Sequence, residues 1–189
     1  NLVWNLGGNR MSQKTELDLR LKHILDVDRA NIWESAQNIL DKAERGAKTI
    51  MGLGYVQSGK TTSISALSAL ASDNGYRLIV AMLGSTILLK NQNKSRVEEY
   101  LGVDEQTYVW KSISNFNLGT TPGEIGEYLS RGRTVFIPLI KNATIIDKVA
   151  SILARVENAG FKTLLIDDEA DQASLNTKVG SEEQSRTYE

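Results

Sequence analysis

The sequence has no cysteine, one histidine (His23) and only two prolines. The absence of cysteine excludes a disulfide framework and a thiolate metal site, and it is typical of a reducing compartment. We therefore expect a cytoplasmic protein. One histidine leaves little scope for imidazole chemistry or a histidine metal site. With so few prolines and no Ser/Gly-rich tract, nothing in the composition marks an internal domain boundary.

Long apolar runs and an excess of one charge are also missing. The longest apolar runs, 78–83 and 135–140, are six residues each, whereas a membrane span needs about 18. The chain begins at Asn1 and has no signal-peptide pattern, so we read it as a fragment of a soluble protein without a membrane segment. Its 22 basic and 23 acidic residues nearly balance. Any surface that binds nucleic acid must therefore be local, because such a surface has to be basic.

The apolar pattern predicts alternating strands and helices. A chain of 189 residues has the size of one ordinary domain. Buried-strand patterns cover 49–53, 76–83, 133–139 and 162–167; helical periodicity covers 61–72, 86–101 and 144–159; a weaker strand is expected at 108–116, and a loop with one short helix at 117–132. This alternation favours an α/β fold with a mostly parallel sheet flanked by helices.

The part before Gly46 has helical spacing only, at 17–25 and 32–43. We therefore predict an N-terminal helical extension over 1–46. A phosphate-loop domain should follow over 47–180. Residues 181–189 are polar and charged, and we expect them to begin a further downstream region.

The segment 54–61, GYVQSGKT, fits the phosphate-loop pattern of two glycines, a lysine and a hydroxyl residue. The glycines allow successive amide N–H groups to point inward at phosphate oxygens, and the next helix adds its positive end. Lys60 would bind the outer phosphates, and the Thr61 hydroxyl would ligate Mg²⁺. The alternative is a Gly-rich turn that binds nothing. The candidate nucleotide-binding residues are Gly54, Gln57, Ser58, Gly59, Lys60, Thr61 and Thr62.

A second candidate segment is 164–171, LLIDDEAD, in which an apolar strand ends in four acids. The carboxyl ends of parallel strands share one edge, so these acids should emerge beside the phosphate loop. Asp168 would hold Mg²⁺ through water, and Glu169 would accept a proton from the attacking water. Lys60, Asp168 and Glu169 are thus the candidate catalytic residues. The alternative is a solvated acidic turn.

Together the two segments resemble a known family. Residues 168–171 spell the DEAD box of superfamily-two helicases, and GYVQSGKT with LLIDDEADQASLNT is similar to the bacterial Z-one domain family of helicase-like ATPases. The segment 75–92, GYRLIVAMLGSTILLKNQ, is similar as well. The resemblance covers about residues 30–180. It implies a three-layer RecA-like fold that binds ATP and Mg²⁺ and hydrolyses ATP.

The sequence departs from helicase-like enzymes in two respects. It lacks the Thr-Ala-Thr-type motif after the acidic segment, and it lacks the second RecA-like lobe that supplies an arginine to the outer phosphate. The resemblance therefore implies the first lobe of a DNA-dependent ATPase. The family is associated with bacterial restriction and antiviral defence, often beside a Hsp90-type or MutL-like ATPase partner.

In such lobes the loops at the strand ends contact nucleic acid, here DNA. The matching residues are Ser85, Lys90 and Asn91 in one loop and Lys141 and Asn142 in another. Lysines and backbone amides there would contact phosphates. The alternative is that these are ordinary solvated residues and helix caps.

Two residues upstream of the phosphate loop have a competing explanation. Trp33 and Gln37 lie four residues apart, and a glutamine upstream of this loop reads adenine in DEAD-box proteins. The flanking proline and aromatic residues of that motif are absent. Core packing for Trp33 and solvent exposure for Gln37 are the favoured interpretation.

Two classes of function remain open. The first is an ATP-driven motor lobe on DNA, and the second is a nucleotide-gated switch or scaffold that docks partner proteins without moving along nucleic acid. A GTPase fits less well, because the pair Asn93-Lys94 is followed by Ser95-Arg96 and not by the aspartate that reads guanine.

Overall fold

A computed structural model describes residues 5–6, 9–10, 30–50, 52, 59–84, 86–103, 109–140 and 142–168. The predicted helical segment at 17–25 lies outside these residues. The chain forms two compact units: residues 1–76 with 95–110, and residues 77–94 with 111–189. Each is described by itself. Every helix in the described part of the chain is too short or too polar to cross a membrane.

The second unit is built on a parallel four-stranded sheet. Its strands are β3 (Tyr76–Met82), β4 (Trp110–Ser112), β5 (Thr134–Leu139) and β6 (Lys162–Asp167), in the order β4-β5-β3-β6. In the central pair the register runs from Leu78 opposite Val135 to Met82 opposite Leu139. The expected α/β fold with a parallel sheet is confirmed.

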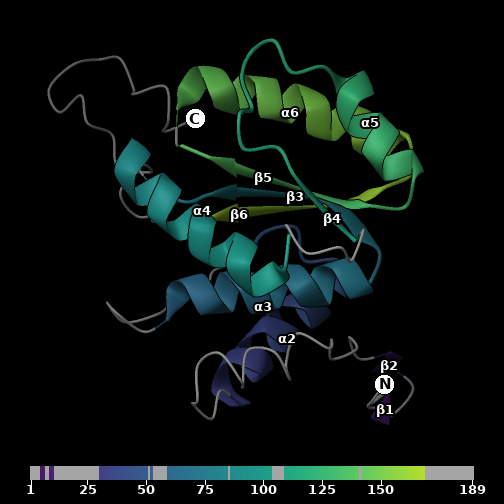
Figure 1. Ribbon diagram of the computed structural model, residues 1–189. Helices are drawn as coiled ribbons and strands as arrows, with labels where there is room; N and C mark the ends of the chain where they lie inside the picture. The colour runs from purple at the N-terminus through teal and green to yellow at the C-terminus, as the bar shows by residue number, and fades with distance from the viewer. Residues whose placement is uncertain are drawn as a thin grey trace, which may run out of the picture. The chain divides into compact units, whose positions relative to one another are not determined.

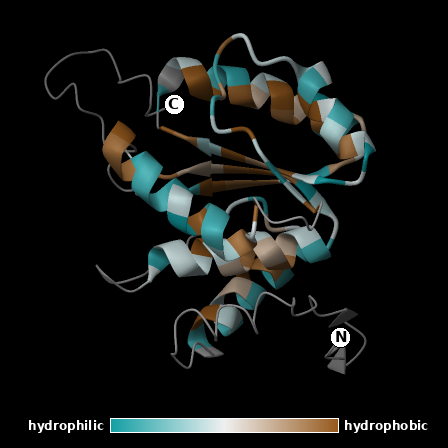
Figure 2. Ribbon diagram, in the orientation of Figure 1, coloured by the Kyte–Doolittle hydropathy of each residue, from teal (hydrophilic) through white to brown (hydrophobic). Residues whose placement is uncertain are grey.

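Helices α5 (Pro122–Ser130) and α6 (Ala143–Asn158) cover one face of the sheet (Figures 1 and 2). Alternate strand residues pack against them because side chains of a strand alternate between faces. Fully buried side chains also occupy the opposite face, among them Ile79 and Phe136. A sheet buried on both faces needs continuous apolar strands, which explains the uninterrupted runs in the sequence. The core on the α5 and α6 side consists of Leu78, Val80, Met82, Ile125, Leu129, Val135, Ile137, Leu139, Val149, Ile152 and Val156.

Local capping fixes where these two helices begin. The Thr121 side chain accepts a hydrogen bond from the Glu124 amide at 3.2 Å, and Pro122 occupies the first turn. The Asn142 side chain accepts from the amides of Thr144 and Ile145 at 3.0 and 3.3 Å. Both residues have the short polar side chains that favour this position. The short helix expected within 117–132 is therefore α5.

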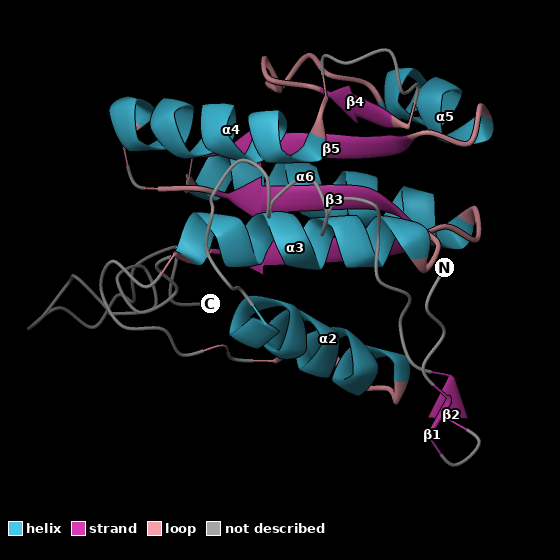
Figure 3. Ribbon diagram, turned by 60° about the horizontal axis from the view of Figure 1, so that its bottom comes forward, coloured by secondary structure: helices cyan, strands magenta, loops and turns pink. Residues whose placement is uncertain are grey.

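In the first unit α2 (Ala30–Glu44) packs on α3 (Lys60–Asp73), and β1 (Asn5–Leu6) pairs with β2 (Asn9–Arg10) (Figure 3). Trp33 is buried in this contact region of α2, as expected. Gln37 is half-buried and makes interactions of its own, so the expectation of solvent exposure is wrong. Its position between buried Trp33 and buried Leu40 on the helix accounts for this.

The predicted strand over 49–53 is not formed at those of its residues that the structure describes. Of the segment 49–53, the structure describes residues 49, 50 and 52, and none of them is in a strand. Thr49 and Gly52 are exposed. A glycine inside so short a run weakens a strand because it adds no side chain to pack and loses more backbone entropy. Strands β1 and β2 were not predicted: they lie within 1–46, where only helices were expected, so a purely helical extension is wrong at these four residues. The strands and helices from α2 onward match the predicted ranges closely, apart from β4, which is shorter than 108–116.

The start of β3 is tied to the end of α2 by a polar contact. The Tyr76 hydroxyl donates a hydrogen bond to the Glu44 carboxylate. Burial of the phenol, with the charge and hydrogen bond of Glu44, raises the pKa of Tyr76 from 10.0 to about 12. All three effects favour the protonated phenol.

Stability should therefore fall at high pH through Tyr76. Because the pKa of Tyr76 is raised in the folded state, its contribution is complete below pH 10.0 and is lost as pH rises through about 12. The linkage is worth at most about 2–3 kcal/mol. Urea unfolding of the wild type and of Tyr76→Phe measures it across this range. Parallel pH curves for the two proteins would contradict the assignment.

Candidate functional site: the start of α3 and the carboxyl edge of the sheet

Four of the predicted nucleotide-binding residues lie in the described part of the chain: Gly59, Lys60, Thr61 and Thr62. Gly54, Gln57 and Ser58 lie outside it. Gly59 has φ 79° and ψ 32°, the left-handed conformation that glycine adopts without steric cost. It immediately precedes Lys60, the first residue of α3. The backbone therefore turns sharply into the helix at the second glycine of the motif.

Gly59, the residue before α3, has no side chain to cap the helix, and the first turn of α3 has no acidic residue. The first helical hydrogen bond runs from the Ser63 amide to the Gly59 carbonyl at 3.0 Å. The first amides of an α-helix form the positive end of its dipole. An end of this kind is suited to an anion such as a phosphate.

The side chains at this end differ in exposure. Lys60 is exposed, Thr61 is half-buried and Thr62 is buried. The Thr61 carbonyl accepts a hydrogen bond from the Ser65 hydroxyl at 2.9 Å, which binds the first turn to the second. Lys60 can therefore reach a ligand with its charge, whereas the buried Thr62 side chain belongs to the helix packing.

The acidic segment begins at the carboxyl edge of the sheet. Asp167 ends β6 and is exposed, and Asp168 follows it and is half-buried. The Asp168 amide donates to the Met82 carbonyl at 3.0 Å, so the β6–β3 ladder continues to this residue. Glu169 and Asp171 lie outside the described residues. Lys60 belongs to the first unit and Asp168 to the second, so their predicted meeting stays a prediction.

The loop after β3 is held close to the sheet. Gly84 has φ 143°, and a Cβ there would lie 2.9 Å from the Leu89 Cβ. Only glycine fits without displacing α4 (Ile87–Leu101). The Asn93 side-chain amide donates to the Leu83 carbonyl at 2.9 Å. The amino-terminal half of α4 is thereby fixed against the end of β3.

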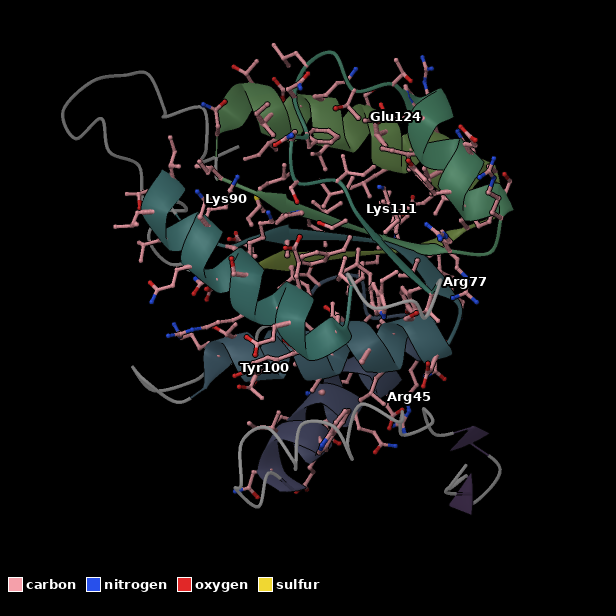
Figure 4. All side chains as sticks on the ribbon, in the orientation of Figure 1. Arg45, Arg77, Lys90, Tyr100, Lys111 and Glu124 are labelled. Atoms are coloured by element: carbon pink, nitrogen blue, oxygen red, sulfur yellow. The ribbon has the colours of Figure 1, made fainter. Side chains whose placement is uncertain are left out.

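A pocket of about 420 Å³ opens at the carboxyl end of β5. It brings together Lys90 and Asn142, which come from the two loops predicted to contact nucleic acid (Figure 4 labels Lys90). Ser85 and Lys141 of those loops lie outside the described residues, and Asn91 is exposed. The other lining residues, which were not predicted to belong to a site, are Ser114, Phe116, Leu118, Pro138, Leu139, Ile140, Thr144 and Ile145. An isolated leucine at 118 in a Gly- and Thr-rich loop was the one available signal.

Comparisons with protein-family models, with curated proteins and with solved structures found no match to this chain. The similarity to the Z-one family stays a prediction from the motifs.

The conformation of Gly59 gives a direct test of the turn into α3. We expect Gly59→Ala to destabilise the protein by about 1–2 kcal/mol, because an L-residue is strained at φ 79°. Gly126→Ala is the matched control, since Gly126 lies inside α5 with open space around its Cα. That change should stabilise by about 0.5–1 kcal/mol. Urea unfolding measures both, and a neutral Gly59→Ala would exclude the left-handed turn.

Proposed function

We propose that this chain is the ATP- and Mg²⁺-binding first lobe of a helicase-like P-loop ATPase. The observation that carries the proposal is the start of α3. The second glycine of the motif, Gly59, is left-handed and has no side chain to cap the helix, and the motif lysine stands exposed at that end. This is the backbone that a phosphate cradle requires. The parallel sheet with its helices is compatible with the RecA-like, three-layer form of the α/β fold.

In this proposal the first turn of α3 would hold the triphosphate. Lys60 would neutralise the outer phosphates, and backbone amides from the segment 54–62 would bind their oxygens. The Thr61 hydroxyl would ligate Mg²⁺, which accepts few protein ligands and keeps several waters. Bound Mg²⁺ would neutralise charge that develops on the phosphate oxygens. The amino-terminal end of α3 fits the triphosphate and its metal because the first turn has no carboxylate that would repel the phosphates or bind the metal in their place.

The acidic residues after β6 would complete the site. Asp168 would reach the metal through water, and Glu169 would accept the proton of the attacking water. The half-buried position of Asp168 at the carboxyl edge supports the proposed role in holding the metal, since ligands of parallel α/β sheets bind at that edge. A second lobe with an arginine would be needed for fast turnover, and DNA-dependent movement would follow from closure between the lobes.

The lysine provides the first test. Lys60→Ala should abolish measurable ATP binding, because the helix end alone would then face the phosphate charge. Lys48→Ala is the control, since Lys48 is another exposed lysine of the same unit. Titration calorimetry with Mg²⁺–ATP compares the two. Equal affinity of Lys60→Ala and wild type would rule out the phosphate cradle.

The acidic segment provides the second test. In the longest natural polypeptide that carries this sequence, Glu169→Gln should bind ATP normally and lose about 10²–10⁴-fold in turnover, the usual contribution of a positioned base. Asp167→Asn changes a neighbouring exposed acid and should leave turnover nearly unchanged. Release of phosphate is the measurement. Normal turnover by Glu169→Gln would assign the base to another residue.

A further inference from the structure

Apolar side chains are exposed in the lining of the pocket at the carboxyl end of β5 and in the turn of α4 that carries Lys90 of that lining. Among the described residues, four of the six exposed large hydrophobic side chains are Ile87, Leu88, Leu89 and Leu118. Ile87 and Leu88 are 67% and 78% exposed in the first turn of α4, and Leu118, which is 57% exposed, lines the pocket. Ile87 lies three residues before Lys90, so both occupy the same side of α4. Clustered exposed apolar residues mark interaction sites.

The pocket provides a concave anchor beside these residues. Its apolar lining comes from three elements: Phe116 and Leu118 after β4, Pro138 to Ile140 at the end of β5, and Ile145 in α6. Phe116 and Ile145 also pack against the sheet core, so the floor is rigidly supported. A volume of about 420 Å³ accommodates a large side chain with its neighbours. Buried anchors of protein interfaces occupy pockets of this kind.

The charge of the pocket lining indicates which kind of ligand the pocket binds. Among the described lining residues Lys90 is cationic and none is acidic. The amides of Thr144 and Ile145 are already bonded to the Asn142 side chain, so this end of α6 does not offer them to a phosphate. A strand of nucleic acid is bound by a track of cations along its backbone. The one lysine among the described lining residues, beside an apolar surface, instead suits an apolar group with a single neighbouring negative charge.

We propose that this pocket, together with the turn Ile87–Leu89, docks a partner polypeptide. The partner inserts one large apolar side chain and places an adjacent carboxylate against Lys90. The docking does not depend on nucleotide binding at α3.

The probe is a synthetic peptide with one tryptophan between aspartates, compared with a peptide that has alanine for the tryptophan and one that has lysines for the aspartates. Methyl NMR signals of Leu118, Ile140 and Ile145 report binding. The acidic tryptophan peptide should shift these signals and bind at least about tenfold more tightly than either control peptide, since both the anchor and the charge contribute. Oligothymidylate is titrated in parallel.

Two matched variants localise the effect. Leu118→Ser should weaken binding of the acidic peptide about fivefold, whereas Leu165→Ser, at a similarly exposed leucine of β6, should leave it unchanged. Lys90→Glu should reverse the preference between the acidic and the lysine peptide. These side chains lie at the surface, so the variants should fold, and the NMR spectrum verifies this.

Three results would overturn the proposal. The first is the absence of any shift at about 1 mM acidic peptide. The second is shifts of equal size with all three peptides. The third is a shift with oligothymidylate alone, which would make the pocket a nucleic-acid site.

Discussion

The parallel ladder between β3 and β5 is the constraint on which the rest of the second unit depends. Residues 78–82 pair with 135–139, and both strands are buried on their two faces. A slip of one residue would move the side chains packed against α5 and α6 to the other face. Side chains as different as Phe136 and Ala81 are fully buried and could not exchange places without clashes and cavities. Burial thus fixes the register, and the register fixes where each strand leaves the core.

The ladder between β3 and β5 determines the geometry of the carboxyl edge of the sheet. The Leu83 amide donates to the Leu139 carbonyl at 3.0 Å, and the Asp168 amide donates to the Met82 carbonyl at the same distance. Three strands therefore end at adjacent points, and polar or charged residues follow each of them. Gly84 then permits α4 to start close to the sheet, and Asn142 caps α6. The pocket lies between the end of β5, Lys90 of α4, the start of α6 and the loop after β4.

The parts of the fold with strong local signals could be predicted from the sequence. Continuous apolar runs gave β3 and β5, and helical periodicity ending at Gly160 gave α6. The segment 49–53 carried an apolar run of the same kind without forming a strand at its described residues, because a short run with a glycine depends on tertiary partners. The pocket could not be predicted at all. Its lining residues, from Lys90 to Ile145, meet only through the order of the strands, which no local pattern encodes.

Helix α3 is buried along most of its length. From Thr62 to Ser72 nearly every side chain is buried, and this stretch includes small residues such as Ala66 and Ala69. The Ser68 hydroxyl is buried without a hydrogen-bond partner among the described residues, so its small size, and not its polarity, suits this position. A helix so enclosed can present chemistry only at its ends. Its carboxyl end leads through Asn74 and Gly75 directly into β3, which leaves the first turn, with the exposed Lys60, as the part of α3 that is open to a ligand.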